Sequence, residues 1–156
     1  MPTPLTSLLD RDRIRVRLES TSKAVLLESM VHLVATHEAV RDPDRLLRDV
    51  KAREATMSTG VGEGLALPHA RTLAVSETVA AFATLRSPVP FDALDGQPVH
   101  LVLLLAGPEA DRAAHLHTLS WVSRILSDAG VRRHLSAAAS ADDVLAVLHD
   151  AEAAVA

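Results

Sequence analysis

The feature that most constrains the fold is the run LVLLL at residues 101–105, five consecutive aliphatic side chains. A strand that is apolar on both faces must be covered on both faces, as in the centre of an α/β sheet. Residues 78–85 form a second β-leaning run, and Ile14, Val16 and Leu18 alternate with arginines at the period of a half-buried strand. We therefore expect one mostly buried sheet between helical layers.

Helical patterns lie between and after these strands. The spacing of apolar residues predicts helices over about residues 23–36, 43–53, 111–127 and 131–138, and a last helix that begins after Ser140. Ser22 is a suitable N-cap for the first helix, and Asp42 followed by Pro43 is typical of a helix start. The pattern indicates an α/β fold, and 156 residues fit one domain.

Charge and composition exclude several classes of function. The chain has 16 basic and 20 acidic residues, a formal charge of −4, and only two phenylalanines and one tryptophan as aromatic residues. We therefore expect no nucleic-acid binding, because the chain offers neither a basic surplus nor a row of aromatic rings for base stacking. Cysteine is absent, which excludes disulfides, thiolate metal sites and cysteine nucleophiles.

The N-terminal segment and the apolar runs bear on location. Residues 1–13 lack the basic segment and long apolar stretch of a secretion signal. No run approaches the roughly 20 apolar residues that cross a bilayer. We expect a cytoplasmic protein without direct membrane insertion.

Residues 53–69, REATMSTGVGEGLALPH, hold the clearest candidate for chemistry. Glycines at alternate positions allow positive φ angles and close backbone approach, and the apolar run 65–67 predicts a short strand that ends at the imidazole of His69. Such a segment loses conformational entropy on folding and gains little packing, so a functional role for His69 is favoured over a structural one. We predict that His69 is a nucleophile.

Two further histidines, His115 and His117, lie two positions apart on a predicted helix. They point about 200° apart, so only one can face the sheet. His115 shares a stripe with Leu119 and Val122, and His117 falls on a more exposed face. Spacing alone supports a hydrogen-bonded core histidine and a site residue equally at His115. The remaining histidines, at positions 32, 37, 100, 134 and 149, are expected to be surface, edge or packing residues.

Other active-site signatures are absent. His37-Glu38 lacks the second histidine of a zinc-protease helix, and no Walker A or Gly-x-Ser-x-Gly sequence occurs. The glycine-rich segment follows a helix, whereas a dinucleotide fingerprint follows a strand. A metal site on His69, His115 and His117 is disfavoured because the last two diverge. We therefore expect no cofactor and no metal.

A family resemblance covers nearly the whole chain, from about residue 5 to residue 151. It rests on Arg53-Glu54, on STGVGEGLALPH at residues 58–69, on HLHTL at residues 115–119 and on PVPFD and DGQPV within residues 88–99. The chain resembles the IIA domain of the fructose/mannitol class of the bacterial phosphoenolpyruvate:sugar phosphotransferase system, including its nitrogen-regulatory relatives. The resemblance implies a single domain over residues 1–156 with a mixed sheet of about five strands, flanked by helices on both faces.

The resemblance also implies a phosphotransferase component that works as a histidine phosphocarrier. In that family a histidine accepts a phosphoryl group from phospho-HPr and passes it to a IIB protein. By match to the motif, His69 is the phosphorylated residue, and Arg53 and His115 are expected beside it. Because the chain has no cysteine and no membrane segment, the receiving IIB protein and the permease would be other polypeptides.

Elementary chemistry supports these roles. A neutral imidazole, with an ordinary pKa near 6.5, is a competent nucleophile near neutral pH. Phosphoryl transfer needs donors around the equatorial oxygens, which an arginine, a second imidazole and glycine-loop amides can provide. We expect Ser58, Thr59 and Gly60 to bind the phosphoryl group.

Two functions share this site. The first is a carrier for fructose- or mannitol-type sugar uptake, which passes its phosphoryl group to a separate IIB protein. The alternative is a nitrogen-regulatory module whose phosphorylation state gates binding to a target, and HLHTLS at residues 115–120 looks especially similar to that branch. A domain that has lost transfer is a third possibility, indicated only by Glu63, whose carboxylate we expect to face solvent.

Overall fold

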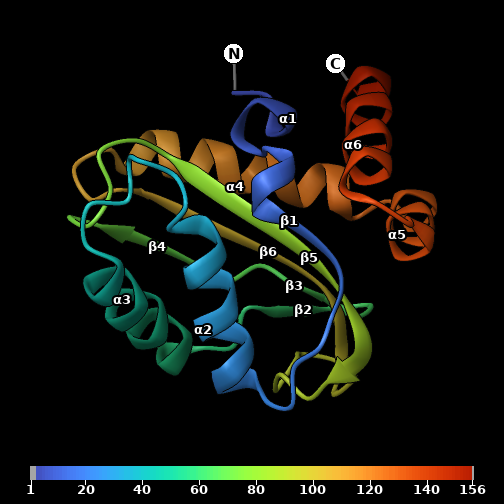
Figure 1. The fold of residues 1–156 in the computed structure, drawn as a ribbon, viewed down its shortest axis with the longest axis horizontal. Helices are drawn as coiled ribbons and strands as arrows, with labels where there is room; N and C mark the ends of the chain where they lie inside the picture. Colours follow the sequence, from blue (N-terminus) through green and yellow to red (C-terminus); the bar gives the residue numbers. More distant parts are fainter. Residues whose placement is uncertain (1–2, 156) are drawn as a thin grey trace.

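The computed structural model describes residues 3–155, which form a single α/β domain around a six-stranded mixed sheet (Figure 1). Its strands are β1 (Ile14–Leu18), β2 (Gly60–Gly62), β3 (Leu65–Ala66), β4 (His69–Thr72), β5 (Val79–Val89) and β6 (Val99–Pro108). The order is β1-β5-β6-β3-β2, and β4 also pairs with β6. The α/β class and the mixed sheet are confirmed, with six strands where about five were expected.

Helices cover both faces of the sheet, as predicted (Figure 1). The helical segments are α1 (Leu5–Leu8), the 3-10 turn η1 (Arg11–Arg13), α2 (Lys23–Val34), α3 (Pro43–Thr56), α4 (Arg112–Leu126), α5 (Ala129–Ala137) and α6 (Ala141–Val155). Helices α2 and α3 pack on one face, and α1 and α4–α6 pack on the other. Within the described residues, none of these helices has the length and apolar character needed to cross a membrane.

Strand β6 is the centre of the sheet, and its alternating side chains divide between the two cores. Val102 and Leu104 pack with α2 and α3, whereas Leu101, Leu103 and Leu105 pack with the helices of the opposite face. All five side chains are 0% exposed. The continuous apolar run therefore has the explanation expected from the sequence: successive residues of a strand point to opposite faces, and both faces are covered.

Side chains cap the predicted helix starts. The Ser22 hydroxyl accepts a hydrogen bond from the Val25 N–H at the start of α2, and Asp42 accepts one from the Arg45 N–H at the start of α3. Asp111 and Asp128 cap α4 and α5 in the same way. Local capping chemistry thus fixes where α3 begins at Pro43 and, ten residues later, where Arg53 lies in its last turn.

The glycine-rich segment is a β-hairpin, not a loop. Strands β2 and β3 pair antiparallel, with Gly60 opposite Ala66, and Glu63 and Gly64 form the turn with φ angles of 58° and 77°. A Cβ at Gly64 would lie 2.2 Å from the His100 ring, so glycine is required there by both space and backbone conformation. Glu63 is exposed, as expected.

His69 begins strand β4 and does not end the strand before it, which corrects the prediction from the apolar run. Strand β3 stops at Ala66, and β4 resumes the same parallel alignment on β6, with Leu65 opposite Leu101 and His69 opposite Leu105. Pro68 lies in the gap because it has no N–H to donate to the ladder. Its carbonyl still accepts a hydrogen bond from the Leu105 N–H at 3.0 Å.

Candidate active site

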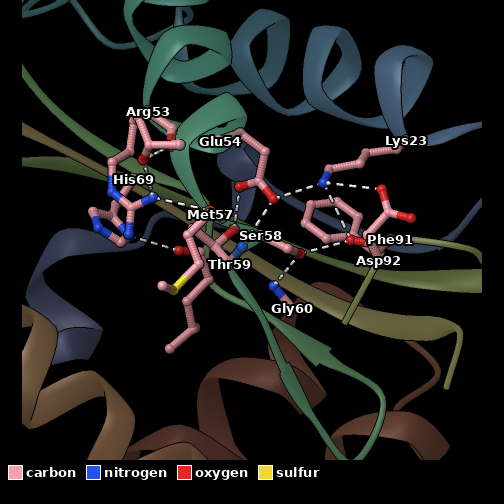
Figure 2. A network of polar contacts seen from close by, with 12 residues as sticks. Lys23, Arg53, Glu54, Met57, Ser58, Thr59, Gly60, His69, Phe91 and Asp92 are labelled. Carbon is pink, nitrogen blue, oxygen red and sulfur yellow. Dashed lines mark hydrogen bonds and ion pairs between the residues drawn. The ribbon is translucent and has the colours of Figure 1, made fainter. Parts of the chain in front are cut away.

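His69 is half-buried, and one of its ring nitrogens is held by the backbone. Nδ1 lies 2.8 Å from the Leu67 carbonyl oxygen. A carbonyl oxygen only accepts hydrogen bonds, so Nδ1 carries the hydrogen and the neutral ring keeps its lone pair on Nε2. Figure 2 shows the ring beside the Arg53 guanidinium at the end of α3.

The surroundings of His69 favour its neutral form. Burial has the largest effect and lowers the pKa of its imidazole below 6.5, while the hydrogen bond to the Leu67 carbonyl partly raises it. The Arg53 charge lowers this pKa and Glu54 raises it, each by less. The ring is therefore neutral near pH 7, which is the state in which an imidazole acts as a nucleophile.

His115, on α4, lies next to His69. The centroids of the two rings are 5.7 Å apart, and the ring planes are tilted by 48°. Only 4% of His115 is exposed, and neither of its ring nitrogens has a hydrogen-bond partner among the described residues. Burial, His69 and Arg71 together lower its pKa to about 4. A buried polar group without a partner costs free energy, so these nitrogens indicate a site for a ligand and not a satisfied core histidine.

Gly107, in β6, makes room for His115, although its sequence pattern did not single it out as a site residue. A Cβ at this position would lie 2.9 Å from His115 Nδ1, closer than side-chain atoms normally approach. The available signal was a glycine that directly follows the apolar residues of the central strand. His117, by contrast, is exposed, as its stripe on the helix predicted.

Arg53, His69 and His115 line one pocket of about 500 Å³. Arg45, Arg71 and Arg112 also line it, against two acidic residues, Asp49 and Glu109. Four guanidinium groups against two carboxylates make the pocket electropositive, which suits an anionic ligand. One nitrogen of the Arg53 guanidinium already has a partner, because Nη1 donates a hydrogen bond to the Met57 carbonyl at 3.0 Å. In residues 3–155, no group of three or more His, Cys, Asp or Glu side chains is arranged to hold a metal ion.

The residues predicted to bind the phosphoryl group lie at the start of β2 and do not line this pocket. The Ser58 hydroxyl donates to the Phe91 carbonyl at 2.7 Å and accepts from the Gly60 N–H. The Thr59 hydroxyl donates to Glu54, and Thr59 is only 4% exposed. Direct contact of Ser58, Thr59 and Gly60 with a phosphoryl group stays a prediction.

Sequence comparison relates nearly the whole chain to known proteins. The family described as "Phosphoenolpyruvate-dependent sugar phosphotransferase system, EIIA 2" matches residues 7–151. A nitrogen regulatory protein of Escherichia coli (strain K12) is 36% identical over 152 residues, which cover 95% of this chain and 91% of that protein. The fructose-specific EIIABC component of Bacillus subtilis (strain 168) is 33% identical over 145 residues, and the match spans only 23% of that protein's length.

Structural comparison gives the same relationship. The crystal structure of the nitrogen regulatory protein IIA-Ntr from Neisseria meningitidis superposes with a TM-score of 0.87 at 34% identity. The match covers 94% of this chain and 99% of that one. The similarity therefore extends along nearly the whole length of both chains.

Proposed function

Because this chain belongs to the type 2 EIIA family of the phosphoenolpyruvate-dependent sugar phosphotransferase system, we propose that it is a phosphohistidine carrier. In this proposal His69 accepts a phosphoryl group from phospho-HPr. The phosphorus–nitrogen bond of the donor phosphohistidine breaks as a new bond forms to His69 Nε2. The proposed attacking atom is Nε2 because Nδ1 is protonated and bonded to the Leu67 carbonyl.

The main support is the environment that His69 Nε2 shares with His115. Beside the nucleophile lies a buried imidazole whose two nitrogens have no partner among the described residues, in a pocket lined by four arginines. In the proposed reaction His115 donates a hydrogen bond to a phosphoryl oxygen, and Arg53 offsets the charge on the transferring group. Donors held in place before the reaction stabilise the transition state without a cost of reorganisation.

We further propose that the carrier is regulatory, of the nitrogen-regulatory type. Support comes from the nitrogen regulatory relatives, which match this chain along at least 91% of their own length in the two cases described above. The fructose-specific protein of Bacillus subtilis is much longer, and this chain corresponds to one part of it, whereas a fructose-specific EIIA component of Haloferax volcanii, 34% identical, is matched along 95% of its own length. A phosphoryl group adds a charge of about −1.5 to −2 at a docking surface, enough to change which partner binds.

Sugar uptake through a separate IIB protein remains the second candidate, favoured by the 33% identity to the fructose-specific protein. This ranking reverses the one made from the sequence, in which sugar transport was the first candidate and the regulatory function was the alternative. Both candidates use the same step at His69, and they differ only in what receives the signal or the phosphoryl group.

The experiment that tests the carrier step is incubation with phosphoenolpyruvate, enzyme I and HPr, followed by intact mass and acid lability of the adduct. The expected result is a gain of one acid-labile phosphoryl group, which is lost in His69→Ala. No gain with a donor pair that phosphorylates a known EIIA protein would overturn the proposal.

The phosphorylated protein then separates the two functions. It is mixed with an isolated fructose-type IIB domain, and the phosphoryl group is followed from one protein to the other. Retention on His69 supports the regulatory function, and rapid transfer to the IIB cysteine supports sugar uptake.

A further inference from the structure

Glu54, next to Arg53 in the last turn of α3, is a buried carboxylate that does not line the pocket, and its polar partners are Lys23 and Thr59 (Figure 2). It is 6% exposed, and its Oε1 lies 2.9 Å from the Lys23 ammonium. The Thr59 N–H donates to Oε1 at 2.8 Å, and the Thr59 hydroxyl donates to Oε2. Burying a charge is costly unless it is paired and hydrogen-bonded, and here both conditions are met.

A chain of hydrogen bonds leads from Glu54 to the nucleophile. Glu54 holds the backbone of Thr59, whose carbonyl accepts the Leu67 N–H at 3.0 Å across the β2–β3 hairpin. The Leu67 carbonyl then accepts the hydrogen of His69 Nδ1 at 2.8 Å. Three hydrogen bonds therefore connect the buried carboxylate to the ring atom that determines which nitrogen is free.

Lys23 supports the same end of the hairpin from a second direction. Its ammonium donates to the Phe91 carbonyl at 3.2 Å and lies 4.6 Å from the centre of the Phe91 ring. The Ser58 hydroxyl donates to that same carbonyl. The ion pair thus joins α2, the end of α3, the start of β2 and the segment after β5 in one network.

Joining α2 to α3 does not by itself require this buried pair. The exposed pair of Lys51 and Glu28, at 3.3 Å, already connects the same two helices. What distinguishes Glu54 is that it accepts hydrogen bonds from both the N–H and the hydroxyl of Thr59. Within residues 3–155, the buried Thr59 hydroxyl has no other hydrogen-bond acceptor.

We propose that Glu54 is a positioning residue that acts through Thr59 and Leu67 to set the orientation and tautomer of His69. It does not contact the phosphoryl group. If the Leu67 carbonyl moves, Nδ1 loses its acceptor, the ring is free to rotate, and the tautomer with hydrogen on Nε2 becomes populated. That tautomer has no lone pair on the nitrogen that faces the pocket and cannot attack there.

Two variants test this positioning role, with one matched control. Thr59→Val removes the hydroxyl contact to Oε2 but keeps the backbone N–H contact to Oε1 and the Glu54 charge, so it weakens the hold on Thr59 without changing the charge. Glu54→Gln removes the charge and leaves Lys23 without its close partner. The control, Glu28→Gln, breaks the exposed ion pair between the same two helices and touches neither the hairpin nor the pocket.

The first measurement needs no donor protein. Nitrogen-15 NMR of the His69 ring near pH 8 reports which nitrogen carries the hydrogen in each folded protein. We expect the hydrogen on Nδ1 in the wild type and in Glu28→Gln, and a substantial population with hydrogen on Nε2 in Thr59→Val and Glu54→Gln. Thermal unfolding of each variant confirms that it is folded under the conditions used.

The second measurement rests on the proposed function and follows the rate of phosphoryl transfer from phospho-HPr. Misplacing a reacting group by about 1 Å costs about 100-fold in rate, so we expect about a 10-fold loss in Thr59→Val and about 100-fold in Glu54→Gln at saturating donor. The donor concentration that gives half the maximal rate should stay unchanged, because Glu54 does not line the pocket. Glu28→Gln should transfer at the wild-type rate.

The two measurements fail in different ways. A wild-type His69 that accepts no phosphoryl group would overturn the proposed function, and the NMR comparison would still decide the role of Glu54. If the ring keeps its hydrogen on Nδ1 in both folded variants, the positioning proposal is wrong, whatever the transfer rates.

Discussion

Acid should destabilise this protein through His115, and the size of the effect follows from where the ring lies. Burial, His69 and Arg71 lower its pKa from 6.5 to about 4. Between those two values the unfolded chain binds a proton at this position and the folded protein does not. Protons then favour the unfolded state, so the free energy of unfolding is fully maintained above pH 6.5 and falls as the pH drops toward 4.

The magnitude comes from the two pKa values of His115. Each unit of difference between the folded and unfolded pKa values is worth about 1.4 kcal/mol of unfolding free energy. At a pH of about 4.5, where protonation of the folded form has just begun, the loss of unfolding free energy is therefore at most about 2.5 kcal/mol. The pocket beside the ring is open to solvent, which screens the buried charge. We therefore expect a loss of about 1.5 to 2 kcal/mol from this group.

The assay compares urea unfolding of the wild type and His115→Asn at a pH of about 7 and about 4.5. Burial also lowers the pKa values of His69 and His100, but these groups titrate in both proteins. The difference between the two pH-dependent losses therefore isolates His115. We expect the wild type to lose about 1.5 to 2 kcal/mol more than the variant. Equal losses in the two proteins would refute the reasoning.

Three further substitutions have defined expected results. Arg53→Ala should slow phosphoryl transfer about 100- to 1,000-fold in a rapid-quench assay, because it removes a preorganised cation from the pocket; an unchanged rate would exclude Arg53 from the site. Gly107→Ala should slow transfer at least about 10-fold with the fold retained, since its Cβ would displace the His115 ring, and an unshifted ring in the NMR spectrum would contradict this. Glu152→Gln should lower the free energy of unfolding by about 2 to 3 kcal/mol in urea titrations, because the carboxylate accepts four hydrogen bonds, one of them from Trp121, and an amide cannot accept them all; a loss below about 0.5 kcal/mol would show that these bonds are replaceable.

The elements of the fold were largely predictable because their signals are local. Helix starts follow from side chains within three residues, as at Ser22 and Asp42, and the central strand follows from five consecutive aliphatic residues. The same locality explains His115: its position on one turn of a helix decides that it faces the sheet. His69 was predicted to be the nucleophile from the glycine-rich segment that precedes it and from the family motif, and this stays a prediction.

The hairpin was missed because glycine is a weak strand former, and its pairing depends on a partner. Gly60 and Gly62 form β2 only because β3 lies beside them and is itself held by β6. Period and propensity cannot indicate this when a strand is two or three residues long. The position of His69 at the start of β4 has the same origin, since the register on β6 continues across Pro68.

The sequence was sufficient for the α/β class and for the layered order of helices and strands, because each depends on neighbours along the chain. The nucleophilic role of His69 is a prediction from the same kind of local pattern. Tertiary structure alone decided that the Leu67 carbonyl holds Nδ1, that Gly107 leaves space for His115, and that Glu54 is paired with Lys23. The contacts of Gly107 with His115 and of Glu54 with Lys23 join different elements of the fold. Leu67 and His69 are only two residues apart, and their geometry depends on the pairing of β3 and β4 with β6. The geometry of all these contacts follows from how the layers fit, a property of the whole folded chain that no single segment contains.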